Sequence, residues 1–173
     1  VYVTLGLDFT ILNNQATTQA NLDKFNQIWG YLSSQSAIKS ADNVMFELIN
    51  EPVLSYANGG WGGNPAETDF VDHWNALKNF QNSIISTIRN NGADNVIWAA
   101  GLGWDQYYQL CASYPLTDPL NNLGYAVHWY PGYGAHDNYE PLQQIWDNTI
   151  KPCADNYPIN ITETTWFKTL PGD

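Results

Sequence analysis

The sequence predicts an α/β fold, and more specifically a portion of a (β/α)8 TIM barrel that contributes about five parallel strands. Strand and helix patterns alternate along the whole chain, which is typical of a parallel sheet with helices outside it. The predicted strands are continuous apolar runs, as burial on both faces of a sheet requires. Polar clusters end three of these runs, and strand ends of this kind are where parallel α/β proteins place their chemistry.

The five predicted strands are short apolar runs bounded by polar residues, glycine or proline. They cover residues 1–7, 44–50, 96–100, 123–130 and 159–163. Apolar residues at helical spacing predict helices over 22–32, 70–88 and 142–150, and a short helix over 104–112. Thr17 and Thr18 offer N-caps to the first helix, and Asn91-Gly92 ends the second. The sequence shows no internal repeat and no interdomain linker, so residues 1–173 are interpreted as a single domain.

Five strands are too few to close an eight-stranded barrel, whose usual length is about 250 residues. An open sheet leaves two unpaired edges, which natural proteins avoid. We therefore expect a domain truncated at both ends, which lacks roughly two strands before and one after. Its edges at 1–8 and 159–163 should be exposed, or covered by missing barrel strands from polypeptide outside this chain. The alternative is a complete five-stranded doubly wound domain.

The composition indicates an ordered domain and excludes several partners. Charged residues make up 13% of the chain, about half the usual usage, whereas aromatic residues make up 14%. A formal net charge of −11 repels phosphate backbones and anionic membrane surfaces, so we expect neither nucleic acid nor a membrane as a partner. No apolar run approaches the roughly 20 residues that span a bilayer. A neutral ligand such as a glucan is compatible with this charge.

The cysteines and histidines predict no metal and no cofactor. Cys111 and Cys153 lack CxxC spacing, and composition leaves open whether they form one disulfide or two buried thiols. The three histidines show no HExxH or paired-ligand spacing. A glycine-rich loop at 59–63 lacks the GK[ST] sequence of a phosphate-binding loop.

Two glutamates end buried strands and carry the strongest functional signal. Glu51, within Asn50-Glu51-Pro52, follows the run at 44–49, and Glu163 follows the run at 159–162. Glu51 has the same parity as Ile49 and Glu47, so strand alternation predicts that it faces the barrel interior. Two such carboxylates are the minimum equipment for cleaving a glycosidic bond. We expect them at the same end of the sheet, with their carboxyl groups within roughly 7 Å.

At these residues the chain resembles the glycoside hydrolase family 5 cellulases of clan A. The resemblance is carried by residues 44–52, by His128-Trp129-Tyr130 and by Ile161-Thr162-Glu163, and it extends over essentially the whole chain. The order and spacing of these motifs match the fourth, sixth and seventh barrel strands of that family. The resemblance therefore implies that residues 1–173 are part of a glycoside hydrolase catalytic domain that contains strands 3–7.

The resemblance also implies a role for each residue in these motifs. Glu51 would be the general acid/base and Glu163 the nucleophile of a retaining mechanism. Asn50 would hydrogen-bond the 2-hydroxyl of the sugar at the cleavage point. His128 would contact the acid/base side of the site, and Tyr130 would hold an oxygen of the nucleophile.

Three tryptophans are further candidates for substrate binding, since the flat apolar face of a pyranose stacks on an aromatic ring. They are Trp61 in the glycine-rich loop, Trp104 just past the third predicted strand, and Trp166 just past Glu163. Each lies at the expected active face, where packing without substrate contact is the alternative.

The resulting hypothesis is an endo-acting β-1,4-glucanase that binds a β-glucan polysaccharide or oligosaccharide. A β-mannanase, xyloglucanase or mixed-linkage glucanase of the same family is the alternative within the enzyme class. A non-catalytic glycan-binding domain is the alternative outside it, and that class predicts an all-β sandwich, against which the helical periodicities argue. We also expect the protein to be extracellular (secreted), with its leader absent from this chain.

Overall fold

A computed structural model of the protein describes residues 1–8, 18–52, 69–130 and 142–164. Five parallel strands form one sheet in sequential order, β1-β2-β3-β4-β5. Their bounds are Val3–Asp8 (β1), Val44–Asn50 (β2), Ile97–Ala99 (β3), Leu123–Trp129 (β4) and Ile159–Thr164 (β5). All five predicted strands are confirmed, each within a few residues of its expected bounds.

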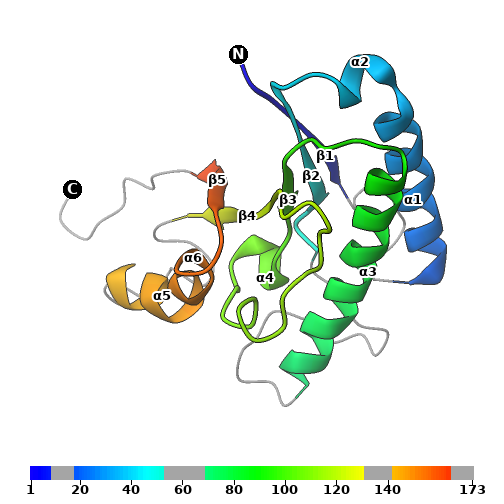
Figure 1. The fold of residues 1–173 in the computed structure, drawn as a ribbon. Coiled ribbons are helices and arrows are strands. Elements are labelled where there is room, and N and C mark those ends of the chain that lie inside the picture. Colours follow the sequence, from blue (N-terminus) through cyan, green and yellow to red (C-terminus); the bar gives the residue numbers. More distant parts are fainter. Residues whose placement is uncertain (9–17, 53–68, 131–141, 165–173) are drawn as a thin grey trace.

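Among the described residues, two long helices and four short ones accompany the sheet (Figure 1). They are α1 (Gln19–Ser34), α2 (Ser36–Lys39), α3 (Phe70–Asn90), α4 (Leu102–Asp105), α5 (Leu142–Thr149) and α6 (Lys151–Ala154). The side chain of Thr18 caps α1 by accepting a hydrogen bond from the N–H of Asn21 at 3.3 Å. At the C-terminal end of α3, Asn91 is the C-cap and Gly92 takes a φ of +72°, which glycine adopts without steric cost.

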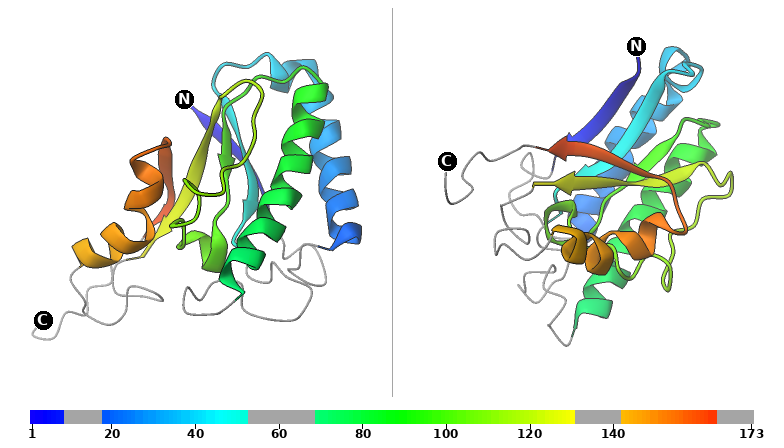
Figure 2. Two further views of the ribbon diagram at one scale, coloured as in Figure 1. Left: turned by 60° about the horizontal axis from the view of Figure 1, so that its bottom comes forward. Right: turned by 90° about the vertical axis from the view of Figure 1, so that its left-hand side faces the viewer.

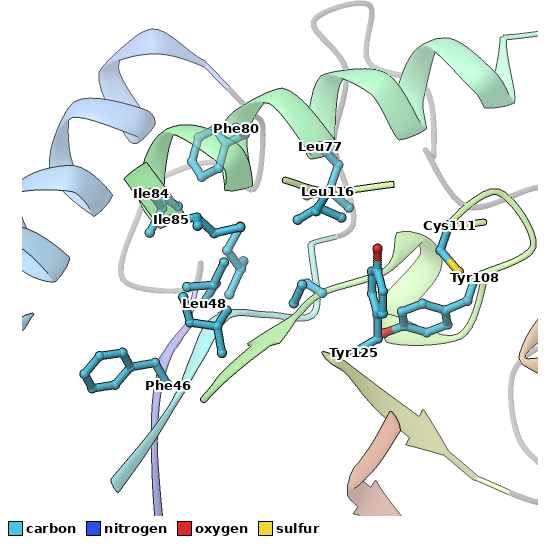
Figure 3. Close-up of a cluster of buried hydrophobic side chains, with 14 of the residues drawn as sticks. Phe46, Leu48, Leu77, Phe80, Ile84, Ile85, Tyr108, Cys111, Leu116 and Tyr125 are labelled. Atoms are coloured by element: carbon cyan, nitrogen blue, oxygen red, sulfur yellow. The ribbon is translucent and has the colours of Figure 1, made fainter. Parts of the chain in front are cut away.

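The hydrophobic core lies between the sheet and the helices (Figure 3). Helix α3 contributes a stripe of buried residues at intervals of three and four, because such residues share one face of a helix. This stripe meets fully buried β2 residues such as Phe46 and Leu48. The cluster continues to Tyr125 of β4 and to Cys111 and Cys153, whose thiols are both free. Burial, together with the neighbouring Cys111 thiol, raises the pKa of Cys153.

The predicted helix over 104–112 is wrong. The structure has only the short element α4, in which Gly103, Trp104 and Asp105 all have left-handed backbone, with φ values of 55°, 58° and 58°. Tyr107 then pairs with Leu102 in an isolated antiparallel bridge. The apolar spacing in this segment reflects burial of a turn, because Leu102, Tyr108 and Cys111 all join the core.

The architecture is an open portion of a barrel (Figure 2). The buried cluster joins α1, α3 and α6 to one face of the sheet, and residues of the other face line a hollow. This sequential order with helices on one side differs from a doubly wound sheet, in which helices cover both faces. Within the described residues the sheet edges are β1 and β5, as expected. No helix in this part of the chain has the length and apolarity to span a membrane.

Candidate functional site

The hollow has a volume of about 320 Å³ and lies on the face of the sheet away from the helices. Its lining comes from the C-terminal parts of strands far apart in the sheet: Gly6, Asp8, Glu47, Asn50, Thr162 and Glu163. Side chains of β2 and β5 meet across the hollow: the hydroxyl of Thr162 donates to Oε1 of Glu47 at 3.3 Å. The curvature of the sheet thus converges polar side chains on one concave surface.

Both strand-end glutamates reach this end of the sheet. An oxygen of Glu51, an oxygen of Glu163 and a ring nitrogen of His128 all lie within 4.8 Å of one another. The expected separation of less than about 7 Å is therefore confirmed. The side chains of Glu51 and Glu163 are 33% and 40% exposed, and Glu163 lines the hollow with Glu51 adjoining it.

Shifts in strand pairing set the directions in which the side chains of these two glutamates point. Between β1 and β2, Gly6 pairs with Glu47 but Asp8 pairs with Asn50, so β2 gains one residue. Such bulges change the direction of a side chain and occur often beside active sites. Glu51 lies just beyond β2 with a φ of +47°. Regular alternation from Glu47, which was the reason given for the direction of Glu51, therefore does not hold across this shift. Glu51 nevertheless reaches the interior side.

The same device operates at the other glutamate. Val127 of β4 pairs with Ile161, but the next residue, His128, pairs with Glu163. The extra residue in β5 lets Thr162 and Glu163, consecutive in sequence, both line the hollow. Regular alternation would have pointed them to opposite faces.

His128 lies between two pairs of carboxyl groups. Its Nδ1 is 2.9 Å from Oε1 of Glu51 and 3.5 Å from Oε2 of Glu163. Its Nε2 is 3.8 Å from Oε1 of Glu47 and 3.8 Å from Oδ2 of Asp105. The ring is fully buried on β4, so these carboxyl groups make up most of its polar surroundings.

The ring of His128 carries a proton in these surroundings. Burial lowers its pKa, but the interactions with Glu47 and Glu51 and the charges of Asp105 and Glu163 outweigh this and raise the pKa to about 10. Two donor sets that include His128 are compact enough to hold a metal ion, one with Glu47 and Asp105 and one with the two strand-end glutamates. Acidic groups at this spacing are common in proteins without an ion, so the spacing alone assigns no metal to either set.

Tyr130 and Asn50 complete the group of predicted residues that the structure brings together. The hydroxyl of Tyr130 donates a hydrogen bond to Oε2 of Glu163 at 2.6 Å. Burial, and then the hydrogen bond to Glu163 and its charge, raise the pKa of Tyr130 to about 12, so it remains a donor. Asn50 is the last residue of β2 and lines the hollow directly.

The three tryptophans differ in what the structure describes. Trp104 is 36% exposed, in the α4 segment just after β3. Trp61 and Trp166 lie outside the described residues. Trp104 is held in a left-handed conformation that costs roughly 1–2 kcal/mol for a residue with a Cβ atom.

Asp105 is the site residue that sequence reasoning missed. It is fully buried and accepts hydrogen bonds from two backbone N–H groups, that of Gly101 at 2.7 Å and that of Glu51 at 3.0 Å. The available signal was an acidic residue in the glycine-containing segment directly after a buried strand. The predicted helix over 104–112 gave no reason to single it out. Asp8, which lines the hollow, was also not proposed as a site residue.

Comparison with known proteins identifies the family. Residues 8–167 match the family model of cellulase (glycosyl hydrolase family 5). An endoglucanase of Halalkalibacter akibai is 33% identical over 103 residues, which are 57% of this chain and 12% of that protein. Endoglucanase E-5 of Thermobifida fusca is 26% identical over 148 residues, which are 83% of this chain and 26% of that protein.

A solved structure has the same fold. It is XEG5A, a xyloglucan-specific endo-β-1,4-glucanase of glycoside hydrolase family 5 from a metagenomic library, in complex with cellotriose. The two structures align with a TM-score of 0.70 and 23% sequence identity, over 96% of this chain and 53% of that one. The chain therefore spans about half the length of this structure and a smaller share of the two endoglucanases.

Proposed function

Because the chain belongs to the cellulase family, glycosyl hydrolase family 5, we propose that it hydrolyses internal β-1,4-glucosidic bonds of cellulose or a related β-glucan. It would do so as part of a catalytic domain that includes polypeptide beyond these residues. The observation that carries the proposal is the close approach of the Glu51 and Glu163 carboxylates, within 4.8 Å. Retaining glycosidases hold their carboxyl groups about 5–5.5 Å apart, whereas inverting ones leave about 6.5–9.5 Å for a water molecule.

In the proposed mechanism Glu163 attacks the anomeric carbon while Glu51 protonates the departing glycosidic oxygen. A covalent glycosyl-enzyme intermediate forms, and Glu51 then removes a proton from the water that hydrolyses it. The hydrogen bond from Tyr130 to Oε2 of Glu163 fits this assignment, because it holds one carboxylate oxygen and leaves the other for attack.

Asn50 and His128 support the two glutamates in this scheme. Asn50 lines the hollow beside Glu163, where its amide can hydrogen-bond the 2-hydroxyl of the sugar being cleaved. That contact strengthens in the transition state. His128, with Nδ1 2.9 Å from Glu51 and 3.5 Å from Glu163, supplies a positive charge that both carboxyl groups share. A charge fixed there lowers the cost of bringing two carboxyl groups together.

The proposed partner is a neutral β-glucan chain, and the proposed location is outside the cell. The chain carries a formal charge of −11 and only six Lys and Arg residues, which suits a neutral polymer better than an anionic one. Trp104 at the end of β3 is a proposed stacking surface for one sugar, and Trp61 and Trp166 remain proposals outside the described residues. An insoluble polymer as substrate favours a secreted enzyme.

The proposal is tested by replacing each glutamate with its amide in the intact polypeptide that carries this sequence. Glu163→Gln should lower turnover of carboxymethyl-cellulose by at least about a thousandfold, because an amide cannot form the glycosyl ester. Glu51→Gln should also lower it severely. Asp118→Asn is the matched control, with turnover compared per folded molecule, since it removes a buried carboxylate that does not line the hollow. Full activity in both glutamine variants would refute the mechanism.

Product stereochemistry and a substrate panel refine the proposal. Proton NMR of the first products should show the β-anomer, as retention requires. Early accumulation of the α-anomer would indicate inversion and contradict the assignment of Glu163 as nucleophile. Initial rates on carboxymethyl-cellulose, mixed-linkage glucan, xyloglucan and mannan then decide between the glucanase and its alternatives, and a clear preference for mannan would overturn the proposed substrate.

A further inference from the structure

Asp105 forms a bridge between two strand ends at the floor of the site. Its Oδ2 accepts the N–H of Glu51, just beyond β2, at 3.0 Å. Its Oδ1 accepts the N–H of Gly101, just beyond β3, at 2.7 Å, and also lies 3.3 Å from the hydroxyl of Tyr108. The side chain is fully buried, so water does not compete for these hydrogen bonds.

The two strands need this bridge because their own pairing stops early. The ladder between β2 and β3 ends at Glu47 and Trp98, which leaves Glu51 beyond the reach of backbone partners on β3. At that point Glu51 has a φ of +47°, a conformation that side-chain-bearing residues rarely adopt. A buried backbone N–H without a partner is costly, and the carboxylate of Asp105 supplies the partner.

The shape around Asp105 is also specified. A Cβ atom at Gly101 would collide with the ring of Tyr108, so only glycine fits where the carboxylate receives the N–H. The side chain of Asp105 itself projects from a left-handed backbone, after two further left-handed residues. Three consecutive residues in this conformation place one carboxylate under Glu51.

Asp105 also touches the second support of Glu51. Its Oδ2, the oxygen that holds the Glu51 N–H, is 3.8 Å from Nε2 of His128. The opposite ring nitrogen, Nδ1, contacts the carboxyl oxygen of Glu51 at 2.9 Å. One aspartate oxygen is therefore linked both to the main chain of Glu51 and, through the histidine ring, to its side chain.

Resting on the proposed function, we propose that Asp105 is a positioning residue for the acid/base step: it fixes the main chain and carboxyl group of Glu51 through these two connections. Its surroundings support this role rather than a stabilising one. Burial raises the pKa of Asp105 to about 7, against the charge of His128 and the two backbone N–H groups. Glu47 also faces it and raises the pKa further.

The experiment exploits the dependence of general acid catalysis on the leaving group. A substrate with a good leaving group needs little protonation, whereas cello-oligosaccharide cleavage needs the acid. In the intact polypeptide, Asp105→Asn should lower kcat/KM for cellotetraose by about 10- to 100-fold, the usual effect of a small misplacement. For dinitrophenyl β-cellobioside the loss should be only about threefold, because that substrate bypasses the misplaced group.

The ratio of the two kcat/KM values is the decisive measurement, because it does not depend on how much of the enzyme is folded. If Asp105→Asn folds poorly, Asp105→Ala takes its place. It removes both acceptors without adding a donor, and it should shift the ratio in the way expected for Asp105→Asn. Asp118→Asn is the matched control, another buried aspartate that accepts two backbone N–H groups, and it should leave the ratio at the parental value.

Glu51→Gln separates this inference from the proposed function. It should change the ratio in the same direction as Asp105→Asn and by more. If Glu51→Gln shifts the ratio and Asp105→Asn lowers both rates equally, the positioning role is overturned and the proposed function stands. If Glu51→Gln itself leaves the ratio unchanged, the acid/base assignment fails, and the role of Asp105 fails with it.

Discussion

The two ends of the sheet treat a buried aspartate in opposite ways. Beside the N-terminal ends of β3 and β4, Asp118 forms a two-point ion pair with Arg89, whose Nε and Nη2 each lie 2.9 Å from one of its oxygens. At the C-terminal ends, the cation beside Asp105 is the ring of His128, at 3.8 Å, and Glu47, Glu51 and Glu163 share that ring. The charge of Asp118 is thus neutralised by its own cation, whereas the charge of Asp105 is not.

The same contrast governs the loops. Besides Asp118, Arg89 donates to the carbonyls of Ala93 and Asn95 at 2.8 and 3.0 Å. The side chain of Asn95 in turn donates to two carbonyls ahead of β2 and to that of Val44, the first residue of β2. These bonds tie together the turns that enter three strands. Positive φ values near this end fall on Gly92 and Asn121, the residue types that tolerate them.

At the opposite end, positive φ values fall on Glu51 and Trp104, where they carry a steric cost, and on Asp105, a residue type that tolerates them better. Strain and unbalanced charge thus coincide on one edge of the sheet, and compensated charge and relaxed turns on the other. The comparison teaches that the first edge is arranged for the positions of particular side chains, and the second for stability.

The largest effect that this comparison predicts is on folding. Arg89→Met should lower the free energy of unfolding by about 3–5 kcal/mol, because it leaves the carboxylate of Asp118 buried without its partner. Activity per folded molecule should not change. Denaturant unfolding of the intact polypeptide measures the first quantity, and active-site titration with turnover measures the second.

The exposed pair of Lys151 and Asp155 provides the control for Arg89. Its atoms are close, at 2.5 Å, but both side chains are about half exposed, so water and salt screen the interaction. Lys151→Met should leave unfolding unchanged. An Arg89→Met protein that unfolds at the parental denaturant concentration would show that this end of the sheet does not hold the fold as described.

The second prediction concerns the opposite signs of the two aspartates with pH. Burial would raise the pKa of Asp118, but hydrogen bonds from Arg89 and from two backbone N–H groups lower it overall. Its stabilising contribution is therefore present above the unfolded pKa of about 3.9 and is lost as pH falls through the folded pKa. Asp105 has its pKa raised to about 7, so the folded state keeps a proton that the unfolded state releases. Its contribution to stability falls as pH rises from about 4 to about 7.

Unfolding curves of the two asparagine variants across this pH range test the difference in sign. The stability lost in Asp118→Asn should shrink toward acid pH, as protonation removes the parental advantage. Relative to the parent, Asp105→Asn should become more stable as pH rises from about 4 to about 7, by up to a few kcal/mol. Parallel curves for the two variants would mean that both aspartates are compensated alike.

Sequence reasoning reached the strands and most of the site because their signals are local. Apolar runs identify β2, β4 and β5, and the polar residues that end them, including Glu51, His128 and Glu163, follow directly. The orientation of the glutamates was not readable in the same way, because it depends on pairing shifts between neighbouring strands. Alternation within one strand carries no information about such a shift.

Asp105 was missed for a related reason. Its hydrogen bond to Glu51 joins residues 54 apart in sequence, and its left-handed backbone is stable only where those partners are present. Apolar spacing after β3 favoured a helix, since Leu102, Tyr108 and Cys111 are buried in the turn as they would be in a helix. Tertiary contacts decided the conformation, and a local pattern could not.

The smallest predicted effect concerns two exposed aromatic residues, one in each region. Trp104 is 36% exposed beside the strained strand end, whereas Tyr31 is 67% exposed on α1, on the helical side. Trp104→Ala should raise KM for cello-oligosaccharides about fivefold, equivalent to about 1 kcal/mol of lost stacking, with little change in kcat. Alanine keeps the Cβ atom, so the backbone cost at this position is unchanged and does not obscure the comparison. Tyr31→Ala should leave KM unchanged. Equal effects of the two substitutions, measured by oligosaccharide kinetics on the intact polypeptide, would show that the strained edge does not present Trp104 to the substrate.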